Sequence, residues 1–146
     1  MPISDRGLEG QAYIYEVVSR SNEAQHDSSR RRFRMRVLVC GGRDYIDQDA
    51  IRRRLAELRD EHPDAVVIHG AAPGADSWAG YIAGTLGLMV EVHPANWAKY
   101  GKAAGPIRNQ EMLDSGVDLL IAFPGGRGTQ DMVSRAQRAG VEVKLA

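Results

Sequence analysis

The 146-residue sequence is poor in cysteine, in excess charge of either sign and in long apolar runs. Its single cysteine, Cys40, cannot form a disulfide within the chain and has no second thiolate for a cysteine-based metal site. Lysine plus arginine equals aspartate plus glutamate at 19 each, so no global field draws the chain to nucleic acid or to an anionic membrane. No apolar run approaches the roughly 20 residues of a membrane span, and no secretory signal opens the sequence. We therefore expect a cytoplasmic protein in which any anion site is local.

Three familiar site motifs are missing as well. The Gly-Lys pair at Gly101 and Lys102 is followed by alanine, so the sequence has no P-loop. The Gly-x-Gly-x-x-Gly fingerprint of dinucleotide-binding folds does not follow the first apolar run. The four histidines are scattered without the spacing of metal ligands, and we expect neither a metal site nor a cofactor.

From residue 36 onward the sequence alternates regularly between apolar runs and helical patterns. Buried strands are expected at 37–40, 65–68, 88–92, 118–123 and 141–145, and helices at 47–60, 77–86, 106–115 and 129–139. Continuous apolar runs indicate strands that are covered on both faces, and their alternation with helices favours a parallel sheet. The expected fold class is α/β, a Rossmann-like three-layer sandwich with a mostly parallel five-stranded sheet and helices on both faces.

Residues 1–35 differ from the rest of the chain and are expected to form a mostly disordered extension. They contain one short apolar patch, at 12–18, and lead into a basic cluster: Arg30, Arg31, Arg32, Arg34 and Arg36. That cluster suggests contact with RNA or DNA, but the acidic residues before it nearly cancel its charge, which favours a solvated linker. We expect residues 36–146 to form the folded domain.

The strongest functional signal is the turn that joins the apolar run 118–123 to the last predicted helix. Its glycines, Gly125, Gly126 and Gly128, permit a sharp bend and close approach of a ligand because they carry no Cβ. A helix beginning near Thr129 aims its free N–H groups and positive dipole end at the carboxyl end of the preceding strand. The turn therefore predicts a phosphate site.

Four motifs, in this order along the chain, carry a family resemblance. They are Val-Cys-Gly-Gly-Arg-Asp-Tyr at 39–45, His-Gly-Ala-Ala-Pro-Gly-Ala-Asp at 69–76, Gly-Pro-Ile-Arg-Asn-Gln-Glu-Met at 105–112 and Phe-Pro-Gly-Gly-Arg-Gly-Thr at 123–129. Together they resemble the YspA-type family of the SLOG superfamily, which includes the LOG phosphoribohydrolases and the DNA-processing protein DprA. The resemblance covers residues 36–146 and implies a Rossmann-like fold that binds nucleotides or nucleotide-derived ligands.

The same resemblance raises the question of catalysis. In LOG-like enzymes the loop Pro-Gly-Gly-x-Gly-Thr-x-x-Glu holds the phosphate of a nucleoside monophosphate, and its glutamate acts with an upstream arginine, which Arg108 matches. The glutamate position is Met132 here, and Asp131 is rotated from it by about 100° around a helix. The candidate catalytic residues are therefore Asp131, Arg108 and Asp44, with Asp76 and Glu111 as further substitutes for the missing acid.

The candidate ligand-binding residues lie in loops near the carboxyl ends of the predicted strands: Gly42, Arg43, Gly74, Asp76, Arg108, Asn109, Gly125, Gly126, Arg127, Gly128 and Thr129. Asp76 is equally well explained as the cap of a helix beginning near Ser77, and Trp97 and Tyr100 as a lid over a base or as packing. The favoured function is binding of a nucleotide-type small molecule, as a sensor or processing protein. The alternatives are N-glycosidic hydrolysis of a nucleoside monophosphate or ADP-ribose-like compound, and DprA-like nucleic-acid binding. A homo-oligomer is expected by analogy with LOG-like relatives alone.

Overall fold

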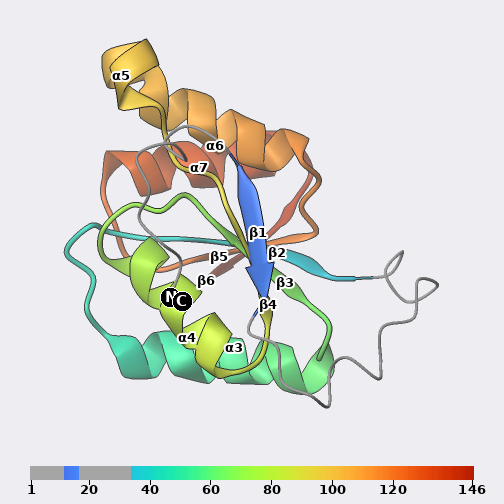
Figure 1. The fold of residues 1–146 in the computed structure, drawn as a ribbon. Helices are drawn as coiled ribbons and strands as arrows, with labels where there is room; N and C mark the ends of the chain where they lie inside the picture. Colours follow the sequence, from blue (N-terminus) through green and yellow to red (C-terminus); the bar gives the residue numbers. More distant parts are fainter. Residues whose placement is uncertain (1–11, 17–33) are drawn as a thin grey trace.

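The computed structural model describes residues 12–16 and 34–146 (Figure 1). In chain order their elements are β1 (Tyr13–Glu16), β2 (Arg36–Cys40), α3 (Gln48–Glu61), β3 (Val66–His69), α4 (Ala75–Thr85), β4 (Met89–Val92), α5 (Trp97–Tyr100), η2 (Gly101–Ala103), α6 (Ala104–Asp114), β5 (Leu119–Ala122), α7 (Arg127–Arg138) and β6 (Glu142–Leu145).

The sheet runs in the order β1-β4-β3-β2-β5-β6. All neighbours are parallel except β1, which pairs antiparallel with β4. The mostly parallel Rossmann-like sheet is therefore confirmed, but the expected number of five strands is wrong by one. The extra strand comes from the apolar patch near the N-terminus, whose β-forming residues Tyr13 and Ile14 pair with an edge of the sheet. Residues 1–11 and 17–33 of the expected disordered extension lie outside the described residues.

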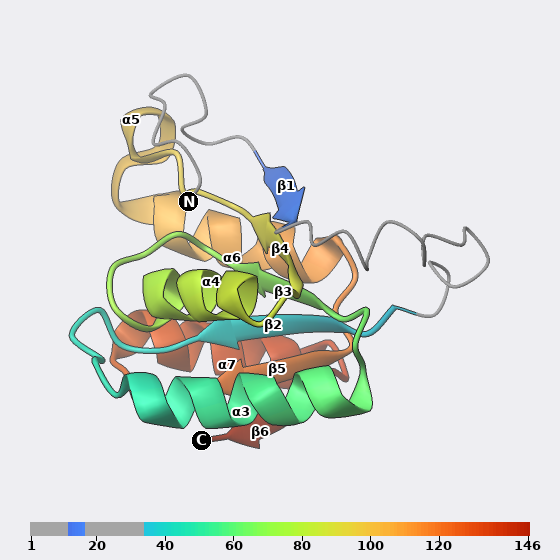
Figure 2. The same cartoon turned by 60° about the horizontal axis from the view of Figure 1, so that its bottom comes forward.

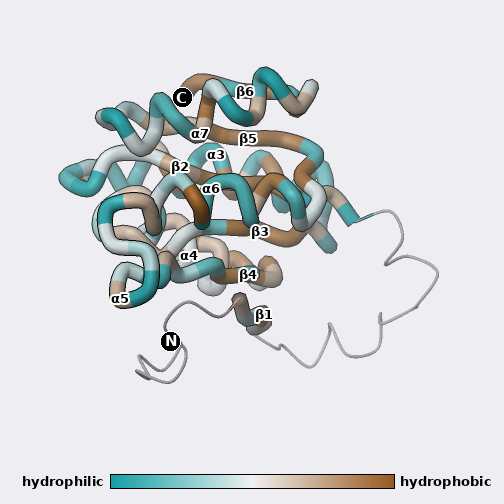
Figure 3. The backbone as a smooth tube through the Cα atoms, turned by 90° about the horizontal axis from the view of Figure 1, so that it is seen from above, coloured by the Kyte–Doolittle hydropathy of each residue, from teal (hydrophilic) through white to brown (hydrophobic). Residues whose placement is uncertain are grey.

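Helices cover both faces of the sheet, as expected. The side chains that alternate between the two faces of each strand show why. Val37 and Val39 of β2 pack into a core with α3 and α4. Leu38 and Cys40, which point to the opposite face, pack into a second core with α6 and α7. Figure 2 shows α3 and α4 in front of the strands, with α6 and α7 behind them. In the hydropathy view the interior strands β3 and β5 are strongly hydrophobic, and the helices around them are more polar (Figure 3).

The helix boundaries differ from expectation mainly around the loops. The stretch expected to be irregular before Pro106 contains α5 and η2, because the Asn96 side chain caps α5 by accepting from Lys99 N. The following helix, α6, begins at Ala104. The last helix begins at Arg127, two residues before Thr129, with Gly126 as its N-cap.

The two described members of the basic cluster are engaged within the fold. Arg34 contacts the sulfur of Met89, and the Arg36 guanidinium pairs with Glu91 at 2.8 Å. Glu91 is buried and also lies 2.6 Å from His93 Nε2. Burial opposes the charge of Glu91, but the hydrogen bonds from His93 and Arg36 outweigh it and lower its pKa to about 2. This ion-pair cluster ties β2 to β4 across the intervening strand.

Candidate functional site

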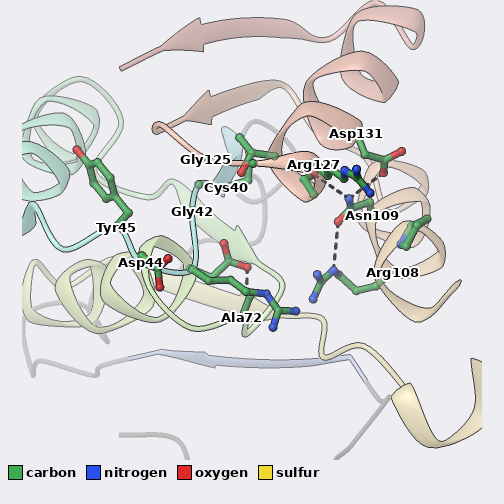
Figure 4. Close-up of a pocket in the computed structure, with 18 of the residues that line it drawn as sticks. Cys40, Gly42, Asp44, Tyr45, Ala72, Arg108, Asn109, Gly125, Arg127 and Asp131 are labelled. Carbon is green, nitrogen blue, oxygen red and sulfur yellow. Dashed lines mark hydrogen bonds between the residues drawn. The ribbon is translucent and has the colours of Figure 1, made fainter. Parts of the chain in front are cut away.

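A cavity of about 910 Å³ lies where the glycine-rich loops after β2 and β5 meet (Figure 4). At this point the strand order reverses, because the chain leaves β2 toward β3 on one side while β5 lies on the other. The cavity brings together these predicted site residues: Gly42, Arg43, Asp44, Asp76, Arg108, Asn109, Gly125, Gly126, Arg127, Gly128, Thr129 and Asp131. Gly74 and Glu111 do not line it.

The cavity also has lining residues that were not among the predicted ligand-binding or catalytic residues. Among them are Cys40, Tyr45, Ala72, Pro106 and Met112. Each lies inside one of the four motifs that carry the family resemblance, so the signal was present in the sequence. Trp97 lines the cavity, whereas Tyr100 does not and instead lies beneath its neighbour Lys99, with 5.1 Å from Nζ to the ring centroid.

The loops after β2 and β5 contact each other at the base of the cavity, and glycines allow them to approach closely. Gly42 N donates a 2.8 Å hydrogen bond to the carbonyl of Pro124. A Cβ at Gly125 would lie 2.6 Å from Gly42 N, so this glycine is required by the protein itself. At Gly126 and Gly128, in contrast, a Cβ would have no described heavy atom within 4 Å. Open space therefore adjoins these two glycines.

The N-terminus of α7 points into this space with its donors free. Gly126 provides no side-chain cap, and the first amide bonded along the helix is Gln130 N, which donates to Gly126 O at 3.0 Å. Among the described residues, nothing accepts from the amides of positions 127–129. Three unpaired amides and the positive end of the helix dipole together form an anion-binding arrangement.

Arg108 reaches the cavity from the second turn of α6. Its guanidinium donates to the carbonyl of Gly70 and, through Nε, to Asn109 Oδ1 at 3.2 Å. Burial lowers the pKa of Arg108, while the nearby Asp76 acts in the opposite direction. The side chain is held in place from two sides, and it remains charged at neutral pH because an arginine starts far above that range.

Asp76 is a floor residue of the cavity and not a helix cap. The helix begins one residue earlier, at Ala75, with Gly74 as its N-cap. The Asp76 carboxylate, which is 5% exposed, accepts from Gly70 N at 3.0 Å and Ala72 N at 3.4 Å through Oδ2. Burial raises the pKa of Asp76 to about 6, although Arg108 and both amide hydrogen bonds act to lower it. The structure thus replaces the capping interpretation with a role in shaping the Gly70–Ala72 loop.

Asp131 is engaged elsewhere and is poorly suited to replace the missing glutamate. Its Oδ2 accepts from Arg135 Nε at 2.8 Å and from Asn109 Nδ2 at 3.0 Å. Burial opposes the charge, but these two hydrogen bonds outweigh it and lower the pKa of Asp131. A carboxylate held ionised in this way links α6 to α7 and does not carry a proton to a ligand.

The remaining polar residues of the cavity differ in their surroundings. Cys40 is buried, and burial with the nearby Asp76 raises the pKa of its thiol to about 12, so it is not a thiolate nucleophile. Asp44 is exposed at the rim. Arg43 lies over the Trp97 ring, 5.8 Å from its centroid.

Across residues 12–16 and 34–146, no group of three or more metal-ligating side chains is brought together.

None of the helices within the described ranges is long and apolar enough to cross a membrane.

Comparison with known proteins places the chain in a family. A profile of the family described as "YspA, cpYpsA-related SLOG family" matches residues 35–100. The Gene 61 protein of Mycobacterium phage D29 is 40% identical over 116 residues, which cover 74% of this chain and 93% of that protein. Among solved structures, DNA processing protein A (DprA) from Streptococcus pneumoniae is similar with a TM-score of 0.43 and 16% identity, over 77% of this chain and 59% of DprA. Because the phage relative matches at this identity over most of both chains, the protein belongs to the YspA, cpYpsA-related SLOG family.

Proposed function

We propose that this protein binds a nucleotide or nucleotide-derived ligand and acts as a sensor or processing protein. The ligand's phosphate is held by the free amides at the start of α7 and by the Arg108 guanidinium. Membership of the SLOG family fits a function related to nucleotides or nucleic acids. The cavity volume of about 910 Å³ also lies within the range of small-molecule sites, which is about 300–1,000 Å³.

The observation that carries this proposal is the empty space beside Gly126 and Gly128. At both positions the protein leaves room for a side chain, and neither has a positive φ that would demand glycine. Neither packing nor a positive φ therefore explains these two glycines. Close approach of an anion to the amides of positions 127–129 does explain them.

A substitution at Gly126 separates ligand binding from folding. Gly126→Asp places a carboxylate among the free amides, where it fills the space and repels a phosphate. Asp is a better N-cap than Gly by a few tenths of a kcal/mol, so the melting temperature should stay the same or rise slightly. Titration calorimetry with a panel of nucleoside monophosphates should show an affinity at least about tenfold weaker than that of the unmodified protein, equivalent to about 1.4 kcal/mol.

Gln130→Asp is the matched control for charge. It adds the same carboxylate to the same helix, on an exposed residue that does not line the cavity. We expect its affinity to change by less than about threefold, because an exposed charge outside the cavity is largely screened. A correctly folded Gly126→Asp protein that binds nucleotides as well as the unmodified one would refute the proposal.

Hydrolysis of the ligand is the second candidate function, and the observation that favours it is the environment of the Asp76 carboxyl. Its buried carboxyl lines the cavity and has a pKa of about 6, close to the range in which a group exchanges protons at neutral pH. Incubation with nucleoside monophosphates, followed by chromatography for free base, distinguishes the two functions. Release of base that Asp76→Asn abolishes indicates N-glycosidic hydrolysis, whereas tight binding without release indicates a sensor.

A further inference from the structure

A second cavity, of about 400 Å³, adjoins the first one. The two share Arg43, Ala72, Trp97 and Arg108 as lining residues. The Arg43 guanidinium and the Trp97 ring, 5.8 Å apart, mark the boundary between them. The far walls of the second cavity come from the Gly70–Pro73 loop and from Pro94 and Ala95. A ligand that fills the first cavity can therefore extend past Arg43 into the second.

Positive charge is concentrated at this boundary. Arg43 and Arg108 line both cavities, and the charge of Arg43 contributes to lowering the pKa of Arg108. Arg43 has no ion-pair partner anywhere in the described part of the chain. No carboxylate lines the second cavity, and Asp76, which lines the first, is held by the amides of Gly70 and Ala72. The other carboxylates of the first cavity are Asp131, which accepts from Arg135 and Asn109, and Asp44, which is exposed at the rim. Within the described residues, none of the three forms an ion pair with Arg43 or Arg108, so this boundary can accept an anion.

The walls beyond the boundary are suited to an organic group. Pro73, Pro94 and Ala95 present nonpolar surface, and the Trp97 ring is 44% exposed and available for stacking. A free terminal phosphate would remain solvated and would not use such walls. A sugar or a base attached to the phosphate would bury against them.

We infer that the ligand is a nucleotide with two linked phosphoryl groups, the second lying between Arg43 and Arg108 and bearing an organic group that enters the second cavity. This inference rests on the proposed function, since the first phosphoryl group occupies the amides at the start of α7. Arginine suits the second position because its fork of donors matches phosphate oxygens in pairs.

The test is a series of ligands titrated into the unmodified protein. For adenine and guanine in parallel, the probes are the nucleoside monophosphate, the diphosphate and the P1,P2-dinucleoside diphosphate. We expect the diphosphate to bind at least about tenfold more tightly than the monophosphate, because it adds charge-assisted hydrogen bonds. The dinucleoside diphosphate should gain at least about threefold more, from the apolar surface that its second nucleoside buries.

Two variants locate the gain within the structure. Arg43→Gln should reduce the advantage of the diphosphate over the monophosphate to less than about threefold, because it removes one charged partner of the second phosphoryl group. Trp97→Ala should remove the further gain of the dinucleoside diphosphate. Arg53→Gln is the matched control, since Arg53 is an exposed arginine of α3 that lines neither cavity, and both gains should persist.

The outcomes separate this inference from the proposed function. If nucleoside monophosphates bind and Gly126→Asp weakens them, but the diphosphate binds no more tightly, the inference is wrong and the proposed function stands. Equal affinity for the diphosphate and the dinucleoside diphosphate also overturns the inference, as does a full diphosphate gain in Arg43→Gln. If no member of the series binds, the proposed function itself fails.

Discussion

At the scale of single residues, the cavity is shaped by how each carboxylate is held. Asp131 receives hydrogen bonds from Arg135 and Asn109 and stays ionised. Asp76 is also hydrogen-bonded, to two backbone amides, yet its pKa is raised because burial outweighs those bonds. The two side chains therefore have opposite effects on stability as pH changes.

Asp76→Asn should alter the pH dependence of folding. The pKa of Asp76 rises from 3.8 to about 6 on folding, so the folded protein retains the proton and the unprotonated form is disfavoured. The unmodified protein consequently loses stability as pH rises from about 4 to about 6, by up to about 3 kcal/mol from this group, and no more above that range. Asn keeps the acceptor for both amides and has no charge to bury, so the variant should lack this loss.

Urea unfolding measured at intervals between pH 4 and pH 7.5 tests this expectation. The free energy of unfolding of Asp76→Asn, relative to the unmodified protein, should increase as pH rises through the window. Comparison with the variant cancels contributions from other titrating groups, including Glu91. Parallel curves for the two proteins would show that Asp76 does not titrate as proposed.

At the scale of elements, Gly74, the N-cap of α4, packs against the loop that follows β2. It has a φ of +77°, and a Cβ there would overlap the carbonyl groups of Gly42 and Arg43. Ala75 N, the first amide of α4, donates to Gly42 O at 3.1 Å. The close contact fixes the loop that presents Arg43, so Gly74 supports the site from behind the cavity wall.

Gly74→Ala and Gly87→Ala form a matched pair that isolates this contact. Both glycines have a φ of +77°, but no described heavy atom lies within 4 Å of a Cβ at Gly87. Gly87→Ala should therefore cost about 1 kcal/mol, from backbone strain alone. Gly74→Ala adds the overlap with two carbonyl groups, and we expect at least about 3 kcal/mol in urea unfolding. Similar losses in the two variants would mean that the loop yields easily.

At the scale of the whole molecule, the N-terminal strand covers one edge of the sheet. β1 pairs along all four residues of β4, including Ile14 with Glu91 and Tyr13 with Val92. An uncovered edge of this kind offers unpaired backbone groups to other chains. The residues that were expected to form a linker therefore include a structural element of the domain.

Deletion of residues 1–33 should expose the edge of β4 and lower the free energy of unfolding by about 1–3 kcal/mol. Self-association should increase with concentration, which analytical ultracentrifugation measures. If the truncated protein stays as stable and as monodisperse as the full chain, β1 contributes little.

The same truncated protein tests the nucleic-acid alternative. Arg34 and Arg36 are engaged within the fold, and the other three arginines of the basic cluster, at 30–32, lie outside the described residues and are removed by the truncation. If the cluster binds single-stranded DNA or RNA, affinity should fall steeply with salt and largely disappear on truncation. Retention of that affinity after truncation would show that the cluster is not the binding surface.

Much of the fold was encoded locally and could be predicted. Short apolar runs bounded by turn residues, such as 119–122 before Pro124, indicate buried strands, since a strand covered on both faces is apolar at every position. The Gly-rich turn before α7 and the four motifs likewise depend on neighbours in sequence. The N-terminal strand, β1, was not predicted because Tyr13 and Ile14 form a strand only through pairing with β4, more than 70 residues away.

The sequence by itself therefore determined the α/β class, the succession of parallel strands and helices, and the loops whose residues line the cavity. Only the tertiary structure decided which of those residues face one another. It placed Asp76, which the sequence left open between helix cap and ligand contact, in the lining of the cavity, paired Asp131 with Arg135 and Asn109, and left Gly74 outside the lining. The reason is physical. Periodicity and turn chemistry report the burial and bending of a local segment, whereas charge, hydrogen bonding and pKa depend on distances between segments that the order of strands in the sheet brings together.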